Sequence, residues 1–124
     1  MTDHFDAYHV ASSFFESYAD ALLRGDADAI ADHYAIPALI EFPEAVIAVH
    51  DRSQTESFFE SGFPQYQNVT RTNHTLSVAS SGPHSIWVEV LWDHHGGAPD
   101  ERNMYQLTFH DKNWRIAVLT PLVS

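Results

Sequence analysis

The chain has 124 residues, the size of one domain, and carries 17 Asp and Glu against 6 Lys and Arg, with 9 histidines and no cysteine. Binding to nucleic acid or to an anionic membrane depends on clustered Lys and Arg, so this composition excludes both classes of partner. The lack of cysteine also excludes disulfides, thiolate metal sites and thiol nucleophiles.

The first segment has the apolar period of an amphipathic helix. Apolar side chains recur three or four residues apart, in the series Phe5, Tyr8, Ala11, Phe15, Tyr18, Ala19 and Leu22. Asp3 is suited to cap the start of this helix, and Gly25 is suited to end it. Asp26 then caps a second, shorter helix, which we expect to reach about Tyr34 and to be closed by Pro37.

A hairpin and a third helix are expected next. Two short apolar runs, 38–42 and 46–50, are separated by a turn and predict paired strands. Ser53 stands three residues before Glu56, the spacing of a capping box in which each side chain bonds the backbone of the other residue. The helix that this box begins is expected to end near Gly62.

The remainder of the chain predicts four long strands. They are separated by turn residues and cover 69–80, 84–95, 102–110 and 114–123. Neighbours joined by tight turns pair antiparallel, and the sheet that they form should be strongly twisted. Helices followed by a run of strands predict a single α+β domain over 1–124, with the helices on one face of the sheet.

The strands carry apolar residues on both faces, which predicts a second cover for the sheet. One face of the second long strand carries Ile86, Val88, Val90 and Trp92, and the other carries Trp87, Glu89 and Leu91. The last strand divides into Trp114, Ile116 and Val118 on one face and Arg115, Ala117 and Leu119 on the other. Helices cover one face only, so we expect a homodimer through the other sheet face.

Several segments resemble the nuclear transport factor 2-like superfamily, which includes ketosteroid isomerase, scytalone dehydratase and SnoaL-like polyketide cyclases. The segments 18–22 and 25–30, followed by Tyr34 and a strand, are similar to its opening. The segment Asn113-Trp114-Arg115-Ile116 is similar to its last strand. The resemblance implies a cystatin-like cone, in which three N-terminal helices pack on a curved mixed or antiparallel sheet. It also implies a pocket at the open end of the cone and a homodimer.

The resemblance to ketosteroid isomerase carries over at some positions only. Tyr18 falls where the isomerase has its oxyanion-hole tyrosine, and Tyr34 falls where some members have a second pocket tyrosine. The general-base aspartate of the isomerase would align with Phe42, and its protonated oxyanion aspartate would align near Tyr105. Both carboxyl groups are missing here, and moving a proton between carbons needs a base.

His74 is the candidate acid–base residue. Scytalone dehydratase has a histidine early in the strand after its third helix, and His74 of this chain falls there. His74 also shares a strand face with Leu76 and Val78, which predicts an inward, partly buried imidazole able to exchange a proton near neutral pH. The alternatives are a structural or exposed His74 and, for Tyr18, a core tyrosine with a backbone partner.

Glu89 has two interpretations. It lies between Trp87 and Leu91 on one strand face, where desolvation would raise its pKa and make it a pocket acid. It can equally form an ion pair with Arg115 or Arg102, and we favour the ion pair.

No metal site or cofactor is expected. His94 and His95 are adjacent on a strand and face opposite ways, so they cannot easily bind one ion. The chain has no phosphate-binding glycine loop and no Gly-x-Ser-x-Gly motif. It shows no signal peptide and no apolar run near the ~18 residues of a membrane span, so a cytoplasmic location is expected.

Two functions remain open from the sequence. The first is an apolar pocket for a small apolar or cyclic ligand, with lyase, isomerase or cyclase chemistry at His74 and Tyr18. Its remaining lining residues would be Tyr34, Phe42, Phe59, Glu89, Trp92 and Tyr105. The second is a non-catalytic homodimeric binding or protein-interaction module. A deep cavity favours the first, and a cavity filled by Phe15, Phe42, Phe59 and Trp92 favours the second.

Overall fold

The computed structural model describes residues 6–42, 45–62, 71–95 and 100–122. Its elements in chain order are α1 (Ala7–Arg24), α2 (Ala27–Ala31), β1 (Tyr34–Phe42), β2 (Ala45–Val49), α3 (Arg52–Gly62), β3 (Arg71–Gly82), β4 (Ser85–His95), β5 (Glu101–His110) and β6 (Asn113–Pro121). The predicted α+β order, with α3 after the first hairpin, is confirmed. The three N-terminal helices that the resemblance implied are only two, because α3 follows β1 and β2. In the part of the chain described, no helix combines the length and apolar character needed to cross a membrane.

Helix α1 begins one turn later than the sequence pattern indicated. Asp6 is its N-cap, and its carboxylate accepts a hydrogen bond of 3.0 Å from the backbone N–H of His9. Asp3, the expected cap, lies outside the described residues. Gly25 ends the helix as expected, at a φ of 62° that glycine adopts without strain, and its N–H bonds carbonyls of the last turn.

Helix α2 is shorter than expected because Tyr34 belongs to a strand. The backbone N–H of Ile116 donates to the carbonyl of His33 at 2.7 Å, and Tyr34 pairs in parallel with Ile116. Pairing with β6 therefore draws this segment into β1, and α2 ends at Ala31. Pro37 lies within β1, in the stretch where the register with β6 shifts, so its missing N–H is tolerated there.

The cap of α3 also differs from the expected one. Asp51, rather than Ser53, accepts a hydrogen bond from the backbone N–H of Gln54, and the Gln54 side chain accepts one from the N–H of Asp51. This is the reciprocal pattern of a capping box, shifted two residues toward the N-terminus. The expected partner Glu56 instead lies 3.7 Å from Arg52, within the helix.

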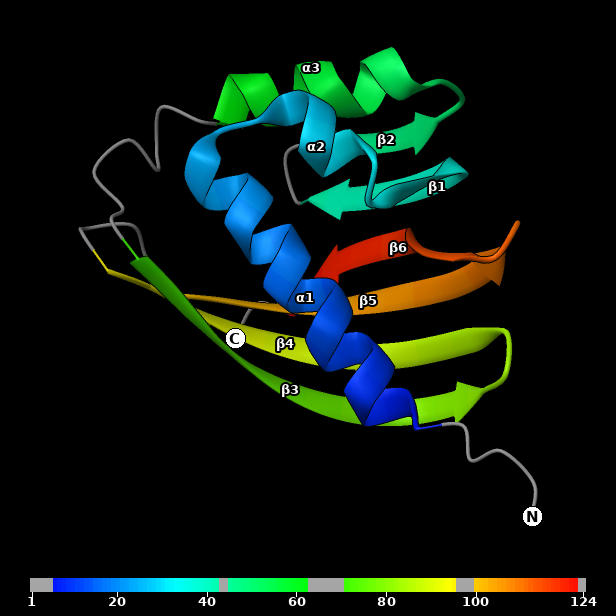
Figure 1. Ribbon diagram of the computed structural model, residues 1–124. Coiled ribbons are helices and arrows are strands. Elements are labelled where there is room, and N and C mark those ends of the chain that lie inside the picture. The colour runs from blue at the N-terminus through cyan, green and yellow to red at the C-terminus, as the bar shows by residue number, and fades with distance from the viewer. Residues whose placement is uncertain (1–5, 43–44, 63–70, 96–99, 123–124) are drawn as a thin grey trace.

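The six strands form one mixed sheet in the order β2-β1-β6-β5-β4-β3. β1 and β6 are parallel, and the other neighbours are antiparallel. Figure 1 shows α1 crossing one side of the curved sheet while α2 and α3 lie together near β1 and β2. Arg52 of α3 ties the two short helices together, since it bonds Asp28 at 2.6 Å and Asp32 at 2.8 Å.

The core lies between the helices and the inner face of the sheet. The face of β4 predicted from its alternation is confirmed, because Ile86, Val88, Val90 and Trp92 are all buried. The corresponding prediction for β6 is wrong. Gln106 pairs with Val118 while Leu107 pairs with Ile116, so Ala117 is an extra residue in the ladder. This irregularity turns Ile116 and Leu119 toward the same inner face, and both are buried.

Candidate functional site

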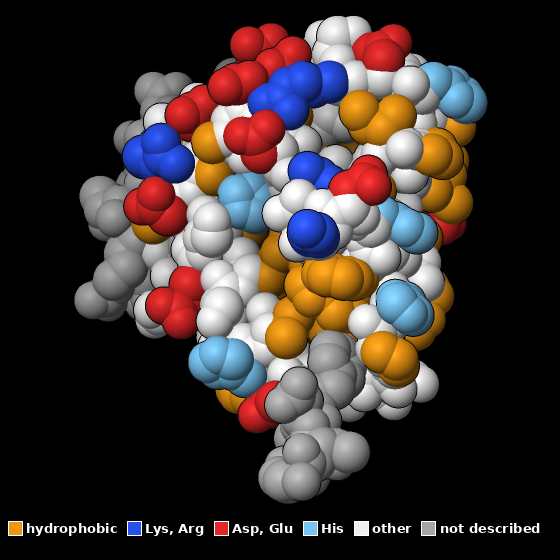
Figure 2. Space-filling view, turned by 45° about the vertical axis from the view of Figure 1, so that its right-hand side comes forward, with side chains coloured by type: hydrophobic (Ala, Val, Ile, Leu, Met, Phe, Trp, Pro, Cys, Tyr) orange, Lys and Arg blue, Asp and Glu red, His pale blue; other side chains and the backbone are white. Residues whose placement is uncertain are grey.

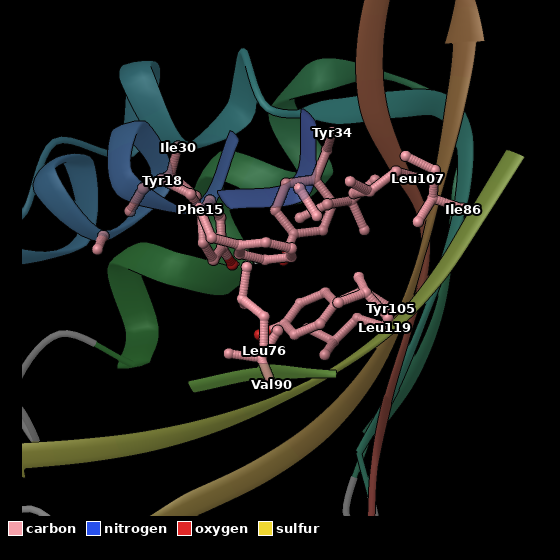
Figure 3. Packing of buried hydrophobic residues seen from close by; sticks show 14 of the residues in the cluster. Phe15, Tyr18, Ile30, Tyr34, Leu76, Ile86, Val90, Tyr105, Leu107 and Leu119 are labelled. Atoms are coloured by element: carbon pink, nitrogen blue, oxygen red, sulfur yellow. Dashed lines mark hydrogen bonds between the residues drawn. The ribbon is translucent and has the colours of Figure 1, made fainter. Parts of the chain in front are cut away.

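Five aromatic side chains from four elements meet at the centre of the fold. This interior cluster consists of Phe15 and Tyr18 of α1, Tyr34 of β1, Trp92 of β4 and Tyr105 of β5, each at most 3% exposed. Figure 3 shows Phe15 lying between α1 and the sheet, close to Tyr105. The ring centroids of Phe15 and Tyr105 are 4.8 Å apart, and those of Tyr18 and Trp92 are 6.1 Å apart.

Two of the buried hydroxyls bond each other. The Tyr18 and Tyr34 oxygens are 2.6 Å apart, and either can be the donor. Burial raises the pKa of Tyr18 well above its ordinary value, and the neighbouring Tyr34, Tyr105 and Glu101 raise it further. Tyr18 is therefore a neutral phenol at physiological pH and can act as a hydrogen-bond donor.

The hydroxyl of Tyr105 accepts two hydrogen bonds. Its donors are the indole Nε1 of Trp92, at 3.0 Å, and the amide Nδ2 of Asn103, at 3.2 Å. Burial is the main reason that the pKa of Tyr105 is raised, and these two donors act in the opposite direction. Tyr105 is thus a neutral phenol whose oxygen is already polarised by two N–H groups.

Asn103 is a site residue that the sequence interpretation missed. It is only 3% exposed, and Tyr105 is the one hydrogen-bond partner of its side chain among the described residues. If the amide were flipped, its oxygen would face Tyr105 and its nitrogen would lack that partner, so one end of the amide is unmatched in either orientation. The signal was its inward position on β5, alternating with Tyr105 and Leu107.

His74 lies at the edge of the interior cluster. It pairs with Trp92 across β3 and β4, and the two ring centroids are 5.3 Å apart. The side chain is half-buried and has no hydrogen-bond partner among the described residues. Desolvation lowers the pKa of His74, while the charge of Glu16 opposes that shift. The imidazole is therefore held mainly neutral at pH 7.

The two phenylalanines expected in the pocket lie at α3: Phe59 belongs to this helix, and Phe42, at the end of β1, packs against it. Phe59 contacts Tyr34 at 5.4 Å between ring centroids, and Phe42 stacks on Phe58 at 5.3 Å. Phe58 and Phe59 also contact each other. A continuous row of rings thus leads from the half-buried Phe42 to the buried Tyr34.

Glu89 lies away from this cluster. Its neighbours Val88 and Val90 are buried on the inner face. Because successive residues of a strand face opposite ways, Glu89 points to the outer face of the sheet. Its carboxylate is 3.3 Å from the Arg102 guanidinium, so the favoured ion pair is the one observed. Both side chains are more than a third exposed, and such a pair contributes little to stability.

The sequence interpretation also missed a polar pair near Tyr18, formed by Ser17 and His33. The His33 Nδ1 is 2.8 Å from the carbonyl oxygen of Ala29, which can only accept, so this nitrogen donates. When the imidazole is neutral, its Nε2 accepts from the Ser17 hydroxyl at 2.9 Å. His33 also packs on Tyr18 with ring centroids 5.6 Å apart, so it covers the outer side of that tyrosine.

No group of three or more His, Asp or Glu in the described ranges could hold a metal ion. The side chains of His94 and His95 lie outside the described part of the structure.

The family model described as NTF2-like protein (DUF6841) matches residues 6–123. The chain belongs to this NTF2-like family. The match spans all nine helices and strands described above. No curated protein matches the chain.

Solved structures of NTF2-like proteins share the fold at low sequence identity. An NTF2-like protein of unknown function from Shewanella oneidensis has a TM-score of 0.77 at 14% identity, over 94% of this chain and 98% of that one. A domain of unknown function with a cystatin-like fold from Nostoc punctiforme has a TM-score of 0.75 at 17% identity, over 96% and 78%. A proposed scytalone dehydratase from Novosphingobium aromaticivorans has a TM-score of 0.66 at 15% identity, over 94% and 84%. These likenesses confirm the cystatin-like fold of this NTF2-like chain.

The lowered pKa of His74 predicts a loss of stability in mild acid. The unfolded chain binds a proton at His74 near pH 6.5, and the folded protein binds it only at lower pH. The stability that neutral His74 contributes is therefore fully present above the pKa of the unfolded chain. It is lost as the pH falls through that value toward the lower pKa of the folded protein. We expect His74→Gln to flatten the fall in melting temperature between pH 7 and 5. His50→Gln is the control, because His50 is exposed, and this variant should keep the wild-type fall in melting temperature. An unchanged fall in His74→Gln would contradict the prediction.

Proposed function

We propose that the chain binds a small, uncharged, apolar or cyclic molecule at the interior cluster and His74. The observation that carries this proposal is Asn103, a buried amide with one end unmatched among the described residues. A buried polar group without a partner destabilises a protein by about 1–3 kcal/mol, and a ligand hydrogen bond would offset that loss. The interior would then be a binding site rather than core alone.

The charge of the surroundings favours an uncharged ligand. The tyrosines at the centre are neutral, because burial raises the pKa of Tyr18 and of Tyr105. The charge of Glu101 raises both pKa values further, so the local field is negative and disfavours an anion. Rings of Phe59 and Trp92 supply apolar contact for a cyclic molecule.

Acid–base chemistry is the finer part of the proposal. A neutral imidazole at His74 can accept a proton from a ligand and return it, and the tyrosine hydroxyls can donate hydrogen bonds to a ligand oxygen. That combination serves a lyase, isomerase or cyclase. The proposed scytalone dehydratase with the same fold is consistent with the first of these reactions.

Native mass spectrometry on gently purified protein tests the binding site. We expect a discrete additional mass on the wild-type chain and roughly 10-fold weaker retention of that ligand in His74→Gln and in Tyr18→Phe, since the first replaces the imidazole by a differently placed amide and the second loses a hydroxyl. The exposed His50→Gln variant should retain the ligand. Circular dichroism should show folded variants. If both site variants unfold, or if both retain the ligand fully, the residues are core and the proposal fails.

A second candidate function is a homodimeric binding module. Five apolar side chains lie on the outer face of the sheet, and we call them the outer band: Leu39, Trp87, Leu91, Met104 and Val118. Leu91 is 47% exposed, and the other four are half-buried. An apolar surface of this kind commonly marks an interface, and a two-fold partner would place the same band against itself.

We expect Leu91→Asp to convert a dimer into a monomer. The substitution places a charge in the outer band. In a two-fold dimer each copy would bring this charge into the contact, so two unpaired charges would be buried. Light scattering coupled to size-exclusion chromatography measures the mass. Leu23→Asp is the matched control, because Leu23 is similarly exposed at 42% but lies on α1. A monomeric wild-type protein, or a Leu91→Asp variant that stays dimeric, would rule out this interface.

A further inference from the structure

A shallow groove lies between the start of α1 and the turn from β5 to β6, separate from the interior cluster. It is open to solvent, has a volume of about 470 Å³, and is lined by His9, Val10, Ser13, Phe14, Lys112, Asn113 and Trp114. Figure 2 looks toward this end of the molecule and shows hydrophobic side chains in a surface hollow, with basic and histidine side chains around it. The volume falls within the range of small-molecule sites.

The walls of the groove are aromatic and held in place. Phe14 contacts Phe15 at 5.1 Å and His33 at 5.2 Å between ring centroids. Trp114 on the opposite wall contacts Phe109 at 5.2 Å. Both wall residues are half-buried, so part of each ring remains open to the groove. The two rings therefore offer apolar surface from opposite walls of the groove.

The rim of the groove carries the single lysine of the chain, Lys112. It occupies the two-residue turn between His110 and Asn113 with a φ of 65°, after Asp111 at 52°. Asn and Gly usually fill such turns, and a side chain such as lysine in this conformation costs about 1 kcal/mol. The turn thus holds a cationic side chain at the edge of the aromatic walls.

The charge of Lys112 is not neutralised within the described residues. Arg24, Arg52 and Arg102 each lie within 4 Å of at least one carboxylate, whereas Lys112, like Arg115, has no such partner there. The side chains of His9 and Ser13, on the opposite wall, also lack hydrogen-bond partners in the described ranges. Lys112, His9 and Ser13 can thus supply hydrogen-bond donors to an anion in the groove.

We propose that this groove binds a small aromatic carboxylate. The ring lies between Phe14 and Trp114, and the carboxylate meets the Lys112 ammonium, with His9 and Ser13 supplying hydrogen bonds. The ligand differs in charge from the uncharged molecule proposed for the interior cluster, and none of the residues that line the groove belongs to that cluster. Asp111 precedes Lys112 in the turn and Asp6 caps α1 before His9, so two carboxylates lie close in sequence to the lining residues, and binding of an anion depends on Lys112.

A titration of ¹⁵N-labelled full-length protein with 2-naphthoate tests the site. We expect the indole N–H signal of Trp114, assigned with Trp114→Phe, to shift and to report the dissociation constant. Lys112→Asn removes the charge and leaves a residue that tolerates the positive φ of the turn. We expect this variant to bind about 10-fold more weakly, the effect of one charge-assisted hydrogen bond. Neutral 2-naphthamide should bind the wild type more weakly by a similar factor.

Arg115→Gln is the matched control, because it removes one positive charge from the opposite face of β6. Its affinity for 2-naphthoate should change less than about twofold. Equal weakening in Lys112→Asn and Arg115→Gln would show a general charge effect and overturn the proposal. Naphthoate shifts confined to Trp92 would place the ligand in the interior and overturn it too. Shifts of Trp114 with protein concentration alone would show that a second copy occupies the groove.

Discussion

Phe15→Ala is expected to lower the free energy of unfolding by about 3–5 kcal/mol, a large part of the roughly 5–15 kcal/mol that stabilises an ordinary domain. Phe15 has no exposed surface, and its ring contacts Tyr18, Trp92 and Tyr105. Removing the ring deletes apolar contacts and leaves a cavity that the rigid sheet and α1 cannot close. Urea denaturation followed by circular dichroism measures the change.

Leu23→Ala provides the comparison on the same helix. Leu23 is 42% exposed near the end of α1, so the substitution should change stability by less than about 1 kcal/mol. Similar losses in Phe15→Ala and Leu23→Ala would mean that the interior cluster collapses around the missing ring. That result would contradict a structural role for the contacts of the Phe15 ring with Tyr18, Trp92 and Tyr105.

Tyr105→Phe is expected to have the second largest effect, a loss of about 2 kcal/mol or more. The substitution preserves the ring but removes the oxygen that accepts from Trp92 Nε1 and Asn103 Nδ2. Two buried N–H groups then lose their acceptor at once. Tyr18→Phe removes only the bond to Tyr34 and should cost about 1 kcal/mol.

The test is whether Tyr105→Phe destabilises the protein more than Tyr18→Phe does. The midpoints of urea unfolding should fall further for Tyr105→Phe than for Tyr18→Phe. Tyr8→Phe is the control, because Tyr8 is 56% exposed on α1 and should be nearly neutral. A Tyr105→Phe variant as stable as the wild type would show that the Trp92 and Asn103 donors find other acceptors, and that the oxygen of Tyr105 is not required.

Local patterns predicted the site residues on regular elements best. Tyr18 and Trp92 were assigned inward positions from a helical period and from strand alternation, and both are buried. His74 was likewise placed on the inner face, beside Trp92 in the ladder. Strand alternation placed Glu89 on one face with Trp87 and Leu91 but did not say which face was inner. The favoured ion pair with Arg102 is found, whereas the expectation that Glu89 lines the pocket is not met. These positions follow from one element at a time.

The polar members of the site could not be found in this way. Asn103 is buried because β5 lies in the middle of the sheet, whereas asparagine is mostly exposed in proteins, so its residue type argued against an interior position. The bonds of Tyr18 to Tyr34 and of Trp92 to Tyr105 join different elements. Their geometry depends on how α1, β1 and the central strands are placed together, which no single stretch of sequence encodes.

The sequence by itself determined the element order, the end of α1 at Gly25, the inner face of β4 and the resemblance to the NTF2-like family. Each follows from backbone and side-chain preferences that act within a few residues. Only the tertiary structure decided the strand that begins at Tyr34 and the irregularity at Ala117. Both arise from pairing with β6, whose partners lie far away in the chain. The same long-range pairing brings Lys112 and Trp114 opposite Phe14 to form the groove.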